Sequence, residues 1–192
     1  VMPPIPEGAE DGIVRGLYLF RPVTDRKAHH ARIVASGSAM GAALRAQAML
    51  AEEHDVAANV WSAPSFQLLR EDAIEVERWN RLHPDEQPRV PYVVEQLGTG
   101  DGPVVAVSDY LKTVPDQIGR FAPQPFIPLG TDGYGRSDTR EALRRHFETD
   151  AEHITVAALE GLAQQERLQR HTVSAAIEQY GLDTAALDPR VR

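Results

Sequence analysis

The chain has 192 residues, of which 42% are hydrophobic and 25% charged, a composition typical of a soluble globular protein large enough to bury a core. Its net charge of −8 argues against a nucleic-acid partner, because phosphate binding needs a basic surface, and no apolar run is long enough to cross a membrane. Cysteine is absent, which excludes disulfides and thiolate chemistry and is compatible with a cytoplasmic location.

The N-terminal stretch, VMPPIPEGAEDG, is rich in proline, glycine and acidic residues, as the linkers between domains often are. The sequence also begins with Val1 and not with methionine. We therefore expect residues 1–15 to be a linker from a preceding domain and residues 16–192 to form the domain itself. The chain would then be a fragment of a longer protein.

Short apolar runs bounded by glycine or proline predict the strands of a sheet. Residues 16–20 are a candidate edge strand. Four further runs are too short for buried helices and predict core strands, at residues 31–35, 56–62, 103–107 and 125–129.

Segments with helical spacing of their apolar residues lie between these runs. Helices are expected over residues 39–54, from a cap at Ser65 to a stop at Pro84, from Pro91 through YVVEQL, over 109–121, from a cap at Asp150 through 168, and over 172–180. Strands that alternate with amphipathic helices indicate an α/β layered fold with a largely parallel sheet.

Residues 130–147, GTDGYGRSDTREALRRHF, read as a glycine-rich loop that leads into a helix. Ser137 or Asp138 is expected to cap this helix, and Asp138 with Glu141 fits a capping box. The loop carries Asp132, Tyr134 and Arg136 as well as Asp138, which is more charge and aromatic surface than a connector needs.

Four arginines follow one another closely in this segment: Arg136, Arg140, Arg144 and Arg145. They can grip a carboxylate or phosphate, or pair with acids of a neighbouring domain. A solvated helix face, with Glu141 and Glu148 among the arginines, explains the same pattern equally well.

Other motifs that would indicate chemistry are weak or missing. The seven histidines lack the spacing of a zinc site, so we expect no metal ligand among them. Ser36-Gly37-Ser38 lacks the Gly-x-Ser-x-Gly pattern of a serine nucleophile. Gly37 and Gly41 flank a strand-to-helix turn without a GxGxxG motif or a Walker lysine, so close packing explains them better than a phosphate site.

Three long strings in the sequence occur together, in this order, in one enzyme family: WSAPSFQLLREDAIEVERWNRLHP (61–84), VSDYLKTVPDQIGRF (107–121) and the loop–helix segment 130–147. With them the chain resembles, from about residue 5 to residue 192, the C-terminal domain of the homodimeric bacterial pyruvate dehydrogenase E1 components, thiamine-diphosphate enzymes of the transketolase superfamily. The resemblance implies a mixed, mostly parallel five-stranded sheet with helices on both faces and a role in dimer assembly.

The same resemblance implies what the chain lacks. In this family thiamine diphosphate and Mg²⁺ bind between the other two domains, and the full-length enzyme decarboxylates pyruvate and acetylates the lipoyl group of the dihydrolipoyl acyltransferase E2. Gly100-Asp101-Gly102 is not followed by the rest of the family's thiamine motif. No catalytic, cofactor-binding or metal-binding residue is therefore assigned, and the chain alone is expected to be inactive.

We expect Asp132, Tyr134, Arg136 and Asp138 to form a contact surface for the rest of the E1 chain or for a second E1 subunit. An arginine fork suits a fixed carboxylate, and a tyrosine is a rigid amphipathic anchor. Two alternatives stay open. The chain can be a free-standing regulatory module that binds a small anion in the cleft beside residues 130–147, or, less favourably, a complete small hydrolase.

Overall fold

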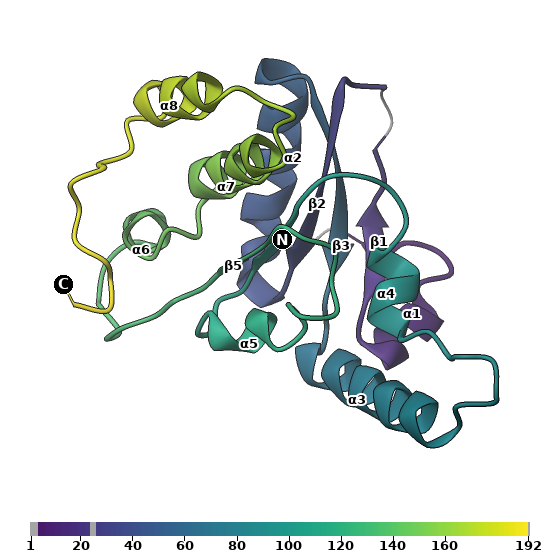
Figure 1. The fold of residues 1–192 in the computed structure, drawn as a ribbon. Coiled ribbons are helices and arrows are strands. Elements are labelled where there is room, and N and C mark those ends of the chain that lie inside the picture. Colours follow the sequence, from purple (N-terminus) through teal and green to yellow (C-terminus); the bar gives the residue numbers. More distant parts are fainter. Residues whose placement is uncertain (1–3, 24–25, 192) are drawn as a thin grey trace.

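The computed structural model describes residues 4–23 and 26–191, and its centre is a five-stranded mixed sheet (Figure 1). From one edge to the other the strands are β1 (Tyr18–Arg21), β3 (Val56–Ser62), β2 (His29–Ala35), β4 (Val104–Val107) and β5 (Phe126–Leu129). Only β1, within the described residues, runs antiparallel to its neighbour. The α/β class, the four core strands and the mostly parallel order are confirmed.

The two faces of the sheet carry separate hydrophobic cores. Successive side chains of a strand point to opposite faces. In β2, Ile33 belongs to one core and Val34 to the other, and in β4 the same holds for Val105 and Val104. All four side chains are fully buried. The central strands are therefore covered on both sides, as their continuous apolar sequences require.

Helices cover both faces, as Figure 1 shows. The first core is closed by α2 (Met40–Glu53), with the short 3-10 turn η1 (Gly37–Ala39) before it, by α7 (Ala151–Gln164) and by α8 (Arg170–Gln179). The second is closed chiefly by α3 (Phe66–Leu82) and α4 (Tyr92–Leu97). The remaining helices are α1 (Glu10–Arg15), α5 (Thr113–Asp116) and α6 (Arg140–His146). No helix in the part of the chain that the structure describes is long and apolar enough to cross a membrane.

The loop from 98 to 102, which enters β4, is fastened by a buried arginine. Arg32 of β2 is 4% exposed, and its guanidinium donates hydrogen bonds to the backbone carbonyls of Gly102 (2.8 Å), Thr99 (3.0 Å) and Gly100. Burial lowers the pKa of this guanidinium, and the nearby charge of Asp101 opposes that effect. We call this arrangement the Arg32 clamp.

The helix expected over 109–121 is wrong for most of its length, since only α5 forms there. The backbone N–H of Tyr110 donates to the Ser108 hydroxyl at 3.1 Å, and that of Lys112 donates to Asp132 Oδ1 at 2.8 Å. The carbonyls of Asp109 and Tyr110 accept from the hydroxyl and the N–H of Thr131, at 2.9 and 2.8 Å, so they do not accept the bonds that a helix over these residues needs. The edge strand is also displaced, because it begins at Tyr18 and ends at Arg21.

The cap expected for α6 is wrong as well. Thr139 is the N-cap, and its hydroxyl accepts a hydrogen bond from the Ala142 N–H at 3.2 Å. Among the described residues Asp138 accepts a side-chain hydrogen bond from the N–H of Thr139 alone, at 2.7 Å. The residue three positions after the cap is Ala142, whose methyl group cannot accept the hydrogen bond that completes a capping box. For α7 the cap at Asp150 is confirmed, but the helix ends at Gln164, before Glu166 takes positive φ.

Within the expected linker, residues 10–15 form helix α1. The turn after α1 packs on the domain: the Tyr92 hydroxyl donates to the Leu17 carbonyl at 2.8 Å, and the Leu17 N–H donates to the Gly12 carbonyl. Residues 1–3 lie outside the described residues. That 1–15 connects to a preceding domain stays a prediction.

Candidate functional site

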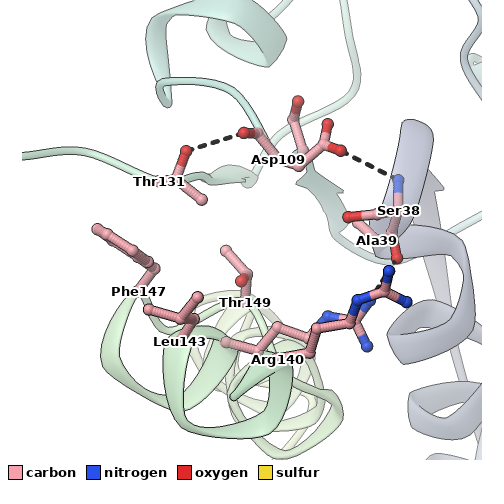
Figure 2. Close-up of a pocket in the computed structure, with 10 residues that line it drawn as sticks. Ser38, Ala39, Asp109, Thr131, Arg140, Leu143, Phe147 and Thr149 are labelled. Carbon is pink, nitrogen blue, oxygen red and sulfur yellow. Dashed lines mark hydrogen bonds between the residues drawn. The ribbon is translucent and has the colours of Figure 1, made fainter. Parts of the chain in front are cut away.

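A cavity of about 380 Å³ opens at the carboxyl ends of β2 and β4 (Figure 2). These two parallel strands are neighbours, but the chain leaves them in opposite directions, from β2 through α2 to β3 and from β4 through α5 to β5. Such a topological switch point is where open α/β sheets most often bind ligands. Helix α6 and the residues just after it form the opposite wall.

The N-terminus of the η1–α2 helical segment is closed by a carboxylate of the chain itself. Asp109, which follows β4, accepts a hydrogen bond from the Ser38 N–H through Oδ2 at 3.2 Å. Gly37 has φ of +56°, and a Cβ added there would lie 2.8 Å from Asp109 Oδ1. Gly37 is thus needed for the close approach of the carboxylate, and the packing interpretation of this glycine agrees with the structure better than a phosphate cradle.

The four arginines of the sequence cluster have different surroundings. Arg144 donates to the Ser38 carbonyl at 3.0 Å, which joins α6 to the start of α2. Arg145 pairs with Asp150, with 2.8 Å between Nε and Oδ2. Arg140 lines the cavity, and Arg136 is exposed and lines a different hollow, between α6 and the C-terminal tail. The cluster is therefore neither a single anion grip nor a uniform solvated face.

Asp150 holds the segment after α6 in place. Its Oδ1 accepts from the N–H of His153 (2.9 Å) and lies 2.7 Å from His153 Nδ1, while Arg145 contacts its other oxygen. Burial alone would raise the pKa of the Asp150 carboxyl, but the hydrogen bonds from His153 and the charges of His153 and Arg145 outweigh burial and lower it.

Two buried residues with hydroxyl side chains, Thr149 and Ser108, line the cavity. Thr149 is 5% exposed, its side chain reaches into the gap in Figure 2, and no hydrogen bond involves its hydroxyl among residues 4–23 and 26–191. Ser108 is fully buried, and its oxygen accepts from the Tyr110 N–H. The remaining lining near α6 is apolar, from Leu143 and Phe147. Sequence reasoning missed both hydroxyls, because neither belongs to a motif.

The four residues expected to form a contact surface do not converge on a reactive centre. Asp132 turns inward and accepts the Lys112 N–H, whereas Tyr134 is 86% exposed and Arg136 and Asp138 lie on the surface. A Cβ on Gly133 would lie 2.3 Å from the Pro189 carbonyl oxygen, so the loop also packs against the C-terminal tail.

The exposed apolar side chains Tyr110 and Leu111 extend the surface around this loop. They are 63% and 50% exposed, and the Tyr110 carbonyl accepts the Thr131 N–H at 2.8 Å, so the two segments lie side by side. Sequence reasoning missed them, because it assigned both to a helix. We use the name loop patch for the surface made of Tyr110, Leu111, Asp132, Tyr134, Arg136 and Asp138. Within the described residues, no group of three or more histidine, aspartate and glutamate side chains could hold a metal ion.

Comparison with known proteins adds the family. Residues 16–150 match the family described as the transketolase-like TK C-terminal domain. The chain is 46% identical over 190 residues to the pyruvate dehydrogenase E1 component of Mycobacterium tuberculosis, 43% over 190 residues to that of Pseudomonas aeruginosa and 40% over 191 residues to that of Escherichia coli K12. These alignments cover 98–99% of the chain but only 20–22% of the relatives. The chain thus spans about a fifth of their length.

Solved structures agree on the fold. A transketolase from Leishmania mexicana superposes with a TM-score of 0.55 at 23% identity, covering 84% of this chain and 20% of that one. A transketolase from Pichia stipitis gives 0.57 at 20% identity, with 86% and 20% covered. The five-stranded sheet, the helices on both faces and the family match agree with one another. The chain therefore belongs to the transketolase-like C-terminal domain family.

Proposed function

We propose that the chain is the C-terminal domain of a cytoplasmic pyruvate dehydrogenase E1 component, and that it serves assembly of the enzyme and not its chemistry. The observation that carries this proposal is identity of 40–46% over nearly the whole chain to relatives of that name, of which the chain spans about a fifth.

In this proposal the rest of the E1 chain carries the chemistry. Thiamine diphosphate and Mg²⁺ bind there, and the full enzyme decarboxylates pyruvate and acetylates the lipoyl group of its E2 partner. The chain itself supplies no catalytic residue. Residues 1–15 connect it to the preceding domain. Within the part of the chain that the structure describes, no loop-patch side chain has the neighbours that a nucleophile or a general base needs.

The loop patch is the surface we assign to assembly with the rest of the E1 chain or with a second subunit. The exposed side chains of the patch include Tyr110, Tyr134, Leu111 and Arg136. Aromatic and arginine side chains are enriched in the centres of protein interfaces. Two contacts fix the loop that carries Tyr134 and Arg136. The Lys112 N–H donates a hydrogen bond to Asp132, and Gly133 packs against Pro189 of the C-terminal tail. A fixed loop loses little conformational entropy when a partner binds.

The isolated 192-residue chain tests the division of labour. We expect calorimetry with thiamine diphosphate and Mg²⁺ to give no binding, and the chain to have no pyruvate decarboxylase activity. A dissociation constant near micromolar, which corresponds to about −8 kcal/mol, would contradict the assignment.

Assembly of the full-length protein tests the loop patch. Arg136→Ala is expected to weaken the dimer by roughly 2–5 kcal/mol if its partner is buried, because the partner's charge is left unpaired. An exposed pair would contribute only about 0–1 kcal/mol. The measurement is the dimer dissociation constant by analytical ultracentrifugation, with Arg70→Ala, an exposed arginine of α3 outside the loop patch, as the control. Unchanged dissociation with a collapsed rate per assembled dimer would assign the loop to the chemistry instead.

A further inference from the structure

The cavity between α6 and the carboxyl ends of β2 and β4 is lined in part by hydroxyl side chains. The Thr149 hydroxyl lies there in a residue that is 5% exposed, and no hydrogen bond reaches it within residues 4–23 and 26–191. Ser108, fully buried on the facing wall, uses its oxygen for the Tyr110 N–H and keeps its own proton to donate.

Positive charge lies at the same cavity. Arg140 and Arg144 both line it, and the structure gives Arg140 neither a hydrogen bond nor an ion pair among the described residues. None of the nearby acids forms a salt bridge with Arg140 among the described residues: Asp109 accepts the Ser38 N–H, Asp150 pairs with Arg145, and Glu141 lines a neighbouring hollow together with Arg140. The guanidinium of Arg140 is therefore available for an anion from outside, and arginine binds carboxylate and phosphate in a two-pronged geometry.

The rest of the wall limits the shape and chemistry of an occupant. Leu143 and Phe147 of the α6 segment, together with Ala39, give the cavity an apolar side. A volume of about 380 Å³ lies within the roughly 300–1,000 Å³ of ligand pockets, which combine an apolar lining with a few polar groups. The N–H of Ser38 at the start of α2 is already taken by Asp109, so this helix end does not supply the anion contact.

We propose that this cavity is a binding site for a small organic anion, a carboxylate or phosphate monoester with a compact apolar body. The anionic group lies on Arg140 and Arg144, the hydroxyls of Thr149 and Ser108 supply hydrogen bonds, and the apolar body packs on Leu143 and Phe147. The site goes beyond the assembly role, because none of these residues belongs to the loop patch. A ligand here would contact both α6 and the strand ends, and would thereby fix α6 against the sheet.

The test is isothermal titration calorimetry on the full-length protein with three probes: benzoate, phenyl phosphate and the uncharged benzamide. We expect saturable binding of benzoate or phenyl phosphate with one site per chain, and no binding of benzamide. Arg140→Ala should lower the affinity at least tenfold, and Thr149→Val, which keeps the shape and removes the hydroxyl, should lower it severalfold. Arg70→Ala should leave binding unchanged, since that residue lies on the opposite face.

Three results would overturn the proposal: no saturable binding of either anion, equal binding of benzamide, or anion binding that Arg140→Ala and Thr149→Val both leave intact. The first includes the case in which another domain of the full-length protein fills the cavity. Ultracentrifugation of the same samples separates this outcome from a failure of the assembly role, because Arg140→Ala is expected to leave the dimer dissociation constant unchanged.

Discussion

The loops 98–102 and 130–135 have similar sequences, GTGDG and GTDGYG, but lie at opposite ends of the sheet. The first enters β4 and is closed over by the Arg32 clamp, with Gly102 so near β2 that an added Cβ would overlap the His30 carbonyl. The second leaves β5, is packed only as far as Gly133, and then presents Tyr134 and Arg136 outward.

This difference in packing and exposure shows that glycine content alone does not distinguish a structural loop from a functional one. What distinguishes them is the arginine. Arg32 points inward and satisfies carbonyls of its own chain, whereas Arg136 lies on the surface. Loops that carry function tend to present side chains from a rigid base, and the 130–135 loop has that form. Substitutions in the two loops, or in the residues that support them, test this contrast.

The largest expected effect is at Gly102. It has φ of +98°, and a Cβ there would lie 1.8 Å from the His30 carbonyl oxygen, so Gly102→Ala should destabilise the chain by roughly 2–5 kcal/mol through backbone strain and overpacking. Gly135→Ala is the matched control, because nothing lies within 4 Å of an added Cβ there. It should be neutral or stabilising by up to about 1 kcal/mol. Urea denaturation of both variants measures this, and similar midpoints would show that the loops are equally constrained.

The next effect is at the arginines themselves. Arg32→Met should cost roughly 2–4 kcal/mol, because the carbonyls that the guanidinium satisfies lose their partner in a buried place. Arg136→Ala should change the stability of the same chain by less than about 0.5 kcal/mol, as surface substitutions usually do. Thermal unfolding of the two variants side by side is the measurement. An equal loss for both would mean that Arg136 also supports the fold.

The smallest expected loss of stability among the supporting residues concerns Asp150. This residue caps α7 at the end of the segment that begins with the exposed loop 130–135. Asp150→Ala should destabilise by about 1–2 kcal/mol through loss of the α7 cap, and Asp150→Asn by less, because asparagine still caps. The folded pKa of Asp150 lies below the usual 3.8. The charge-dependent stabilisation is therefore complete above pH 3.8 and disappears as pH falls through the lower folded value.

Denaturation at about pH 7 and again near pH 3 separates the stabilisation that comes from the charge of Asp150 from the stabilisation that comes from its capping of α7. The stability difference between the natural protein and Asp150→Asn should narrow at the lower pH, while the deficit of Asp150→Ala should persist in part. A difference between the natural protein and Asp150→Asn that stays constant over this range would mean that the charge of Asp150 does not stabilise the fold.

Local patterns are enough to predict the sheet but not the site. The runs at 31–35 and 103–107 predict buried strands because a strand covered on both faces is apolar along its length, a signal that needs no distant contact. The Asp109–Ser38 hydrogen bond joins residues 71 positions apart, and Gly133 meets the chain again at Pro189. The local sequence around each residue does not predict these long-range contacts. Residues 109–112 have a helical pattern but form no helix, because the carbonyls of Asp109 and Tyr110 accept hydrogen bonds from Thr131, a residue that only the folded sheet brings there.

The outer edge of β5 has a consequence for how the domain meets its neighbours. The carbonyls of Pro125 and Leu129 accept hydrogen bonds from N–H groups of the β4 segment. Because the direction of the backbone polar groups alternates along a strand, those of Phe126 and Pro128 point to the outer edge of the sheet, away from β4. The Phe126 N–H already donates to the Gln124 side chain at 3.1 Å, and Pro128 has no N–H. This edge thus offers an incoming strand no backbone donor at either position. This edge therefore disfavours extension of the sheet by β-augmentation from β5, and at this edge it favours side-chain contacts with a neighbour.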